Sequence, residues 1–247
     1  MNRPDPEIFC VEFPGRAVRL AGGVLRALAL PSLSPPGGPL FVRTAGSAPL
    51  GLLNAPAVAL VGTRHPAYGS RIAFEFAAES ALCGFVVVSG LALGCDSAAH
   101  RGCLSAGGTT VAVLPCGVDR VAPVSNIALG AAILNSGGCF VSQYPPGTPP
   151  RNFRFVERNR VIAALAQAVI VIECEERSGT MHTARFALEQ HKPLACYVLE
   201  HGRLSSGCRL LVERHNATPL RNTNDLKLFL ATLSCESETQ GRGGGHV

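Results

Sequence analysis

Short apolar runs alternate along the chain with longer segments that have helical spacing. Six runs are apolar at nearly every position, at residues 57–61, 85–88, 110–114, 139–141, 168–172 and 194–199. Such runs are typical of strands that are buried on both faces of a parallel sheet. Segments with helical spacing fall between them, at residues 70–82, 96–106, 127–134, 158–166 and 181–190. The alternation predicts an α/β fold in which helices cover a mostly parallel sheet.

The same pattern divides the chain into three parts. Residues 1–56 are poorly patterned apart from a short strand expected at 40–43, and we interpret them as a lead-in or linker segment. Residues 57–233 form the predicted main domain, with a looser strand and helix over 208–233. Residues 234–247 are rich in glycine near their end, which predicts a flexible tail. In the first helix, the buried face is expected to carry Ile72, Phe76, Ala77 and Leu82.

The composition fits a protein with a sizeable core. Hydrophobic residues make up 47% of the chain, charged residues 16%, and the formal net charge is +5. Arginine heavily outnumbers lysine, which suits phosphate binding, although a GC-rich genome gives the same bias. With no leader, membrane span or metal-ligand spacing expected, the sequence predicts a cytoplasmic protein without a metal or a membrane partner.

The ten cysteines include no CxxC pair. Four of them lie inside apolar runs: Cys83, Cys139, Cys174 and Cys196. We therefore interpret them as small buried hydrophobic residues of a reducing compartment.

Glycine- and hydroxyl-rich loops follow five predicted strands. Their distinctive members include Gly62, Thr63 and Arg64 in the first loop, Ser89, Gly90 and Gly94 in the second, and Ser178, Gly179 and Thr180 in the fifth. Because parallel strands end at one edge of a sheet, these loops are expected to converge where open α/β sheets bind ligands. Helix N–H groups favour an anion there, and Arg64 adds a fork for phosphate. The alternative is that the glycines permit tight turns and the hydroxyls cap helices.

The fifth loop carries a more detailed expectation. Thr180 is expected to cap the helix that follows, which leaves Ser178 free to reach a ligand. Glu175 and Glu176 would repel a phosphate, so we expect their side chains to point away or to pair with Arg177.

Arginines and phenylalanines interleave just before the helix expected at 158–166. The cations are Arg151, Arg154, Arg158 and Arg160, and the rings are Phe153 and Phe155. This alternation suits single-stranded nucleic acid, because arginines neutralise phosphates and a ring can stack on a base. Arg158 and Arg160 cannot share one helical face, so one of them is expected to be structural.

Asp96 and His100 stand four residues apart and could be imagined as part of a hydrolytic triad with Ser89 or Ser97. No GxSxG sequence is present to hold a serine on a strained turn. We therefore expect Asp96 to cap a helix and His100 to pack against it, with no catalytic residues.

In order along the chain, these loops form blocks of a recognisable pattern. The blocks are GTR with YG at 62–69, SGLALGCDSAAH at 89–100, GVDRV at 117–121, PPGTPP at 145–150, Phe155 with RNRVIA at 158–163, and RSGT, TA and ALEQ within 177–190. Together they resemble the signature of the DprA/Smf (DNA processing) family. The chain departs from that signature at Cys95, where the family has Ile, and at Arg154 and Val156, where it has Asn and Pro.

The resemblance implies a Rossmann-like doubly wound sheet with helices on both faces. It also implies a homodimer without a cofactor or enzymatic activity, which binds single-stranded DNA and helps to load RecA recombinase during natural transformation. With the resemblance included, the expected DNA- and phosphate-binding residues are Gly62, Thr63, Arg64, Ser89, Gly90, Gly94, Arg151, Arg154, Phe155, Arg158, Asn159, Arg160, Ser178, Gly179 and Thr180. The alternatives are a nucleotide sensor or a nucleoside-monophosphate hydrolase on a related fold, although the double-glycine loop of such hydrolases is absent.

Overall fold

The computed structural model describes residues 7–12, 16–19, 40–44, 49–199 and 204–241. Its strands form one ten-stranded sheet in the order β10-β9-β8-β4-β5-β6-β7-β3-β1-β2. The strands are β1 (Glu7–Glu12), β2 (Arg16–Arg19), β3 (Leu40–Thr44), β4 (Ala57–Val61), β5 (Val86–Ser89), β6 (Thr110–Val113), β7 (Cys139–Ser142), β8 (Ala168–Val171), β9 (Leu194–Tyr197) and β10 (Thr218–Leu220). The run from β10 to β7 is parallel, whereas β3 pairs antiparallel with β7, β1 with β3 and β2 with β1.

The sheet is wound in two directions from its middle. From β4 the chain moves through β5 and β6 to β7, and it then crosses to β8 on the other side of β4 and continues through β9 to β10. The predicted Rossmann-like doubly wound sheet is thereby confirmed. The point of reversal lies between β4 and β8, where Val61 is opposite Val171.

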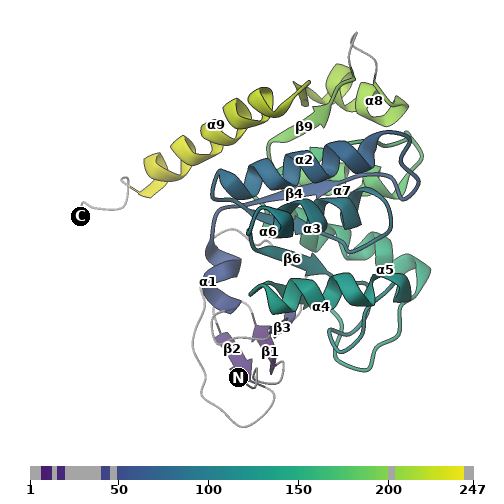
Figure 1. Ribbon diagram of the computed structural model, residues 1–247, viewed down its shortest axis with the longest axis vertical. Coiled ribbons are helices and arrows are strands. Elements are labelled where there is room, and N and C mark those ends of the chain that lie inside the picture. The colour runs from purple at the N-terminus through teal and green to yellow at the C-terminus, as the bar shows by residue number, and fades with distance from the viewer. Residues whose placement is uncertain (1–6, 13–15, 20–39, 45–48, 200–203, 242–247) are drawn as a thin grey trace.

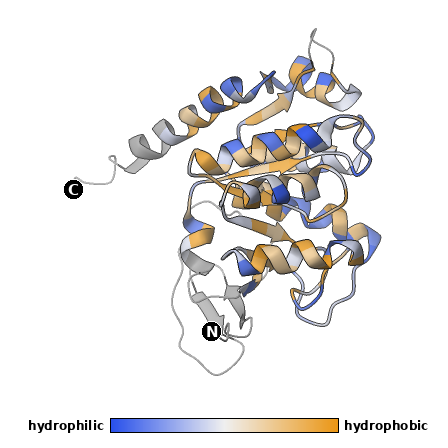
Figure 2. Ribbon diagram, in the orientation of Figure 1, coloured by the Kyte–Doolittle hydropathy of each residue, from blue (hydrophilic) through white to orange (hydrophobic). Residues whose placement is uncertain are grey.

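Helices cover both faces of the sheet (Figure 1). They are α1 (Pro49–Asn54), α2 (Gly69–Leu82), α3 (Cys95–Ser105), the 3₁₀ turn η1 (Val124–Asn126), α4 (Ile127–Asn135), α5 (Asn152–Glu157), α6 (Asn159–Leu165), α7 (Gly179–Glu189), α8 (Ser206–His215) and α9 (Thr223–Gly241). Val58 and Leu60 of β4 pack on the side of α2, α3 and α9, whereas Ala59 and Val61 pack on the side of α6, α7 and α8. Figure 2 shows apolar strands flanked by helices, of which α2 alternates hydrophilic and hydrophobic residues whereas α4 is mostly hydrophobic.

Three details differ from the expected elements. Leu82, the last residue of α2, is 70% exposed, which corrects its predicted place on the buried face. Helix α5 is not among the expected elements, because it has no buried residue and therefore no apolar periodicity in the sequence. Helix α8 precedes β10, so the last part of the domain has one more helix than expected.

The division into lead-in segment, main domain and tail remains a prediction. Strand β3 lies before residue 57 and pairs with β7, and its Leu40 and Val42 are buried in the core. Helix α9 continues to Gly241, past the predicted end of the domain at residue 233. No helix within the described ranges is long and apolar enough to cross a membrane.

Candidate functional site

A cavity of about 330 Å³ lies at the point where the winding of the sheet reverses. It is lined by Val61, Gly62, Thr63, Arg64, Ala92, Asp96, Asn152, Phe155, Val156, Arg158, Asn159, Ile162, Ser178, Gly179, Thr180 and Thr183. These residues come from the end of β4, from the loops after β4, β5 and β8, from the first turns of α3 and α7, and from α5 and α6. Open α/β sheets bind ligands at this location, so we call it the switch-point cavity.

The first turn of α7 forms one wall of the switch-point cavity. The N-cap residue is Ser178 and not Thr180, because the helix begins at Gly179, two residues earlier than expected. Ser178 does not cap through its side chain, and its buried Oγ has no hydrogen-bond partner among the described residues. Thr180 and Thr183, 8% and 2% exposed, add two hydroxyls to the same wall. A helix N-terminus with free N–H groups and free hydroxyls is suited to an anion.

The two glutamates upstream of α7 do not occupy this wall. The carboxylate of Glu175 accepts a hydrogen bond from Ser206 Oγ of α8. The N–H of Glu176 donates to Ser206 Oγ at 3.2 Å. Neither glutamate lines the switch-point cavity. Their expected orientation away from it is therefore observed, with Ser206 rather than Arg177 as the partner of Glu175.

Arg64 belongs to the loop after β4 and lines the switch-point cavity. Its guanidinium carbon is 4.7 Å from the centre of the Phe155 ring, and the side chain is exposed. No carboxylate in the described part of the chain forms an ion pair with it. Arg64 is thus a positioned cation whose charge is available to a ligand.

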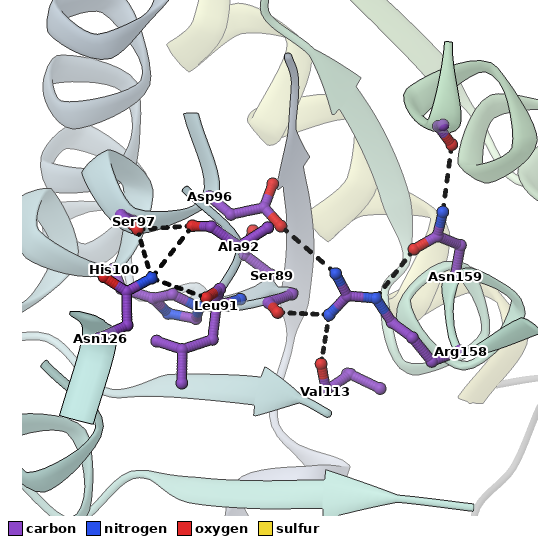
Figure 3. A network of polar contacts seen from close by, with 12 residues as sticks. Ser89, Leu91, Ala92, Asp96, Ser97, His100, Val113, Asn126, Arg158 and Asn159 are labelled. Carbon is purple, nitrogen blue, oxygen red and sulfur yellow. Dashed lines mark hydrogen bonds and ion pairs between the residues drawn. The ribbon is translucent and has the colours of Figure 1, made fainter. Parts of the chain in front are cut away.

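Arg158 is buried beneath the cavity, only 3% exposed (Figure 3). Its Nη1 donates to the carbonyl oxygens of Gly90 and Val113, and its Nε donates to Asn159 Oδ1 at 3.0 Å. Nη2 lies 3.7 Å from Asp96 Oδ2. Burial lowers the pKa of Arg158 to about 10, and burial also raises the pKa of Asp96, an effect that Arg158 opposes.

Through Nε and Nη1, Arg158 holds the loops of β5 and β6 together, whereas Nη2 has only the long ion pair with Asp96 among the described residues. Arg158 also lines the switch-point cavity, so the prediction that it binds phosphate stays a prediction. Asn159 extends the chain of contacts, because its Nδ2 donates to the carbonyl oxygen of Gly179 at 3.1 Å. Both residues position the cavity walls.

The expected cap of α3 by Asp96 is also wrong. The N-cap is Gly94, with φ of 75°, and a side chain there would meet the backbone of Thr63 and Arg64. Asp96 lies within the first turn and faces Arg158. The two strand-end loops are therefore close together at Gly94.

His100 contacts Leu91 and Thr110 instead of Asp96. Its Nε2 accepts the N–H of Leu91 at 3.3 Å, and its Nδ1 lies 2.8 Å from Thr110 Oγ1, which donates to Val87 O at 2.6 Å. This pattern requires a neutral ring with its proton on Nδ1. Leu91 has φ of 55°, so His100 stabilises a strained turn beside the cavity.

The remaining predicted residues lie outside the cavity lining. Ser89 is fully buried and donates to Leu60 O, and the carbonyl oxygen of Gly90 accepts from Arg158. Arg154 lies over the rings of Tyr144 and Phe153, at 4.8 and 5.5 Å. Arg160 contacts the ring of Phe186 at 5.0 Å and Glu189 at 3.9 Å, toward the far end of α7.

Glu173, two residues after the end of β8, makes contacts near the site that the sequence did not reveal. Its carboxylate accepts the N–H groups of Ala67, Tyr68 and Gly69, at 3.0, 3.2 and 2.8 Å. It therefore occupies the N-terminus of α2 as an internal anion. A glutamate at the end of a buried strand carries no local signal of a partner more than a hundred residues earlier.

The eight cysteines with described side chains are free thiols, and Cys83 is exposed, which corrects its expected burial. The others with described side chains, including Cys139, Cys174 and Cys196, are buried. The described residues contain no group of three or more His, Cys, Asp or Glu side chains that could hold a metal ion.

Comparison with known proteins gives a consistent set of relatives. Residues 33–231 match the family described as DNA recombination-mediator protein A. A DprA relative from Mycobacterium tuberculosis is 39% identical over 197 residues, which are 79% of this chain and 50% of the relative. The chain thus spans about half the length of the curated relatives that it matches first.

Two solved structures have the same fold with clear sequence identity. DNA processing protein A from Helicobacter pylori, solved to describe its single-stranded DNA binding mode, has a TM-score of 0.69 and 31% identity, over 83% of this chain and 90% of that one. The DprA structure from Streptococcus pneumoniae has a TM-score of 0.66 and 34% identity, over 77% of this chain and 65% of that one.

Proposed function

Since this chain belongs to the DNA recombination-mediator protein A family, also called DprA or Smf, we propose that it binds single-stranded DNA at the switch-point cavity. The observation that carries the proposal is the wall at the start of α7. Among the described residues, Ser178 Oγ is buried there without a hydrogen-bond partner, and Arg64, which lines the same cavity, has no ion pair. A backbone phosphate supplies the acceptors that both groups need.

Electrostatics in the cavity favour an anion. Asp96 carries the single carboxylate among the described lining residues, and Arg158 neutralises it. The helix dipole of α7 and the charge of Arg64 are then uncompensated. The proposed ligand is therefore a phosphodiester rather than a cationic or neutral molecule.

The finer parts of the proposal come from the family. They are protection of incoming single strands, loading of RecA recombinase during natural transformation, a homodimeric state, a cytoplasmic location and the lack of an enzymatic activity. Consistent with the last of these, His100 is fully buried and neutral, and Asp96 is bound to Arg158, so neither is free to act as a general base.

The alternative is a nucleotide sensor or a hydrolase of nucleoside monophosphates, because the same cavity could seat a single nucleotide. Incubation with nucleoside monophosphates, followed by chromatography for released base, separates the hydrolase from a binding protein. Release of free base at a rate that depends on the protein would contradict the proposed function.

The protein is expected to bind single-stranded oligonucleotides more tightly than blunt duplexes of the same length. Each neutralised phosphate releases counterions, so log K should fall with log salt by about 0.7 per contact on a single strand. Fluorescence anisotropy from about 50 to 200 mM salt measures both quantities. Equal affinities for single-stranded and duplex oligonucleotides, or an affinity that does not change with salt, would contradict the proposal.

Replacement of Arg64 by alanine is expected to weaken single-strand binding by about tenfold and to reduce the salt slope by about 0.7, because one charge-assisted phosphate contact is lost. The melting temperature should stay nearly unchanged, since the side chain is exposed.

The matched control is Arg71→Ala. Arg71 is an exposed arginine of α2 that pairs with Glu75 at 3.1 Å and lies outside the cavity lining. The same loss of affinity in both variants would assign the effect to net charge and not to the site.

A further inference from the structure

A second cavity, of about 480 Å³, lies beside the first. It is lined by Arg120, Val121, Ala122, Pro123, Val124, Pro150, Arg151, Asn152 and Phe155. Its floor and walls come from the loop between β6 and α4 and from the segment that leads into α5. Since apolar side chains of the β6–α4 loop dominate it, we call it the loop cavity.

The loop cavity adjoins the switch-point cavity. Asn152 and Phe155 line both, so these two residues form a shared wall. Arg64, which lines the switch-point cavity, lies over the Phe155 ring. Ligand groups in the two cavities would therefore lie on either side of Phe155.

The turn that carries Val124 is held in place by hydrogen bonds of its buried residue Asn126. Val124 begins η1, and the third residue of this turn, Asn126, is buried. Asn126 Nδ2 donates to Leu91 O at 2.8 Å and to Ser97 Oγ at 2.9 Å, which ties the turn to the loop after β5 (Figure 3). Val124 itself is 75% exposed, an apolar side chain presented on a fixed turn.

Charge around the loop cavity is positive. Arg151 is exposed and has no ion pair with a described residue, and Arg120 has a single carboxylate nearby, Asp119 at 3.6 Å. Asp119 also accepts the N–H of Gly147 at 2.8 Å, so part of its charge is committed to the backbone. Of the described residues that line this cavity, none carries a carboxylate.

We propose that the loop cavity accepts an unstacked base of the same DNA strand whose phosphate lies in the switch-point cavity, with Arg151 and Arg120 on the phosphates beside that base. This inference rests on the proposed function. An apolar pocket flanked by arginines matches the alternation of flat base and charged phosphate along a single strand. The shared wall at Phe155 favours this occupant over a side chain from a protein partner, which would not require the two cavities to adjoin.

The test uses a thymidine oligomer of about 12 nucleotides, a length within the range of single-strand binding sites, with one 2-aminopurine moved along its length. In the wild-type protein, the fluorescence of 2-aminopurine is expected to change at a particular position of the strand. Val124→Asp places a negative charge and a desolvation cost in the pocket, so it should abolish that change and weaken binding by about tenfold.

The control is Ile127→Asp, three residues along the chain. Ile127 is 53% exposed and lines neither cavity, so this variant should bind and report like the wild type. Arg151→Gln is a second, independent variant, which should lower the salt slope by about 0.7 while leaving the fluorescence change in place.

The outcomes separate this inference from the proposed function. If Arg64→Ala weakens binding while Val124→Asp and Arg151→Gln leave affinity, slope and fluorescence unchanged, the loop cavity does not hold the strand and a protein partner becomes its better occupant. If the wild type fails to bind the oligomer at all, the proposed function fails first.

Discussion

Replacement of Arg158 by methionine is expected to lower the free energy of unfolding by about 3–5 kcal/mol. Methionine keeps much of the side-chain volume but removes every donor, so the buried carboxylate of Asp96 loses its counter-charge. The carbonyl oxygens of Gly90 and Val113 also lose their partner. Urea denaturation followed by circular dichroism measures the change.

The control is the equivalent change two residues along, Arg160→Met. Arg160 is 42% exposed and its ion pair with Glu189 is long, at 3.9 Å, so this variant should cost less than about 1 kcal/mol. Adding Asp96→Asn to Arg158→Met removes the unpaired charge and should recover part of the loss. Equal costs for the two single variants would contradict the structural role of Arg158.

The stability of the protein is expected to fall as the pH is lowered from 6.5 toward 3, in part because of His100. Burial lowers the pKa of His100 to about 3 in the folded state, against 6.5 for an exposed histidine. Protonation would place a donor on Nε2 against the N–H of Leu91. Between these pH values His100 is protonated in the unfolded chain but not in the folded chain. It therefore lowers the free energy of unfolding by about 1.4 kcal/mol for each unit by which the pH falls.

The measurement is the unfolding free energy of the wild type and of His100→Gln from pH 7 to pH 4.5. Carboxylates contribute to both curves, so the expected result is a difference between them that grows by about 2–3 kcal/mol over that range. His215→Gln, an exposed histidine in the last turn of α8, serves as the control and should follow the wild type. Parallel curves for wild type and His100→Gln would show that this ring does not carry the effect.

The sheet could be predicted from the sequence because its strands are apolar on both faces. Residues 57–61 were expected as a strand and form β4 with the same bounds, and every residue of β8 is fully buried. Helix α5 could not be predicted, because none of its residues is buried and its interleaved charges and rings have no helical period. The local pattern of apolar residues reveals which positions are buried. A short helix without buried positions therefore leaves no such pattern in the sequence.

The candidate site was predictable in its location and only partly in its residues. Parallel strands place Arg64 and Ser178 at one edge, and the structure brings both to one cavity. Helical geometry also separates Arg158 from Arg160, but which one faces inward depends on carbonyl groups of distant loops. Residue type alone predicts Asp96 as a cap, whereas α3 begins at Cys95, after Gly94, which lies close to the backbone of Thr63 and Arg64.

The carboxylate of Glu173 has a consequence for which ligands the protein admits. In doubly wound sheets the helix after the first parallel strand commonly receives the phosphates of a dinucleotide. Here that helix is α2, and the N–H groups of its N-cap Tyr68 and its first residue Gly69 already donate to the tethered carboxylate of Glu173, which loses no translational freedom when it binds. A free nucleotide would compete against an intramolecular rival whose effective concentration is on the order of millimolar or more. The fold therefore carries an internal anion at the start of α2, in the place where a nucleotide phosphate would bind.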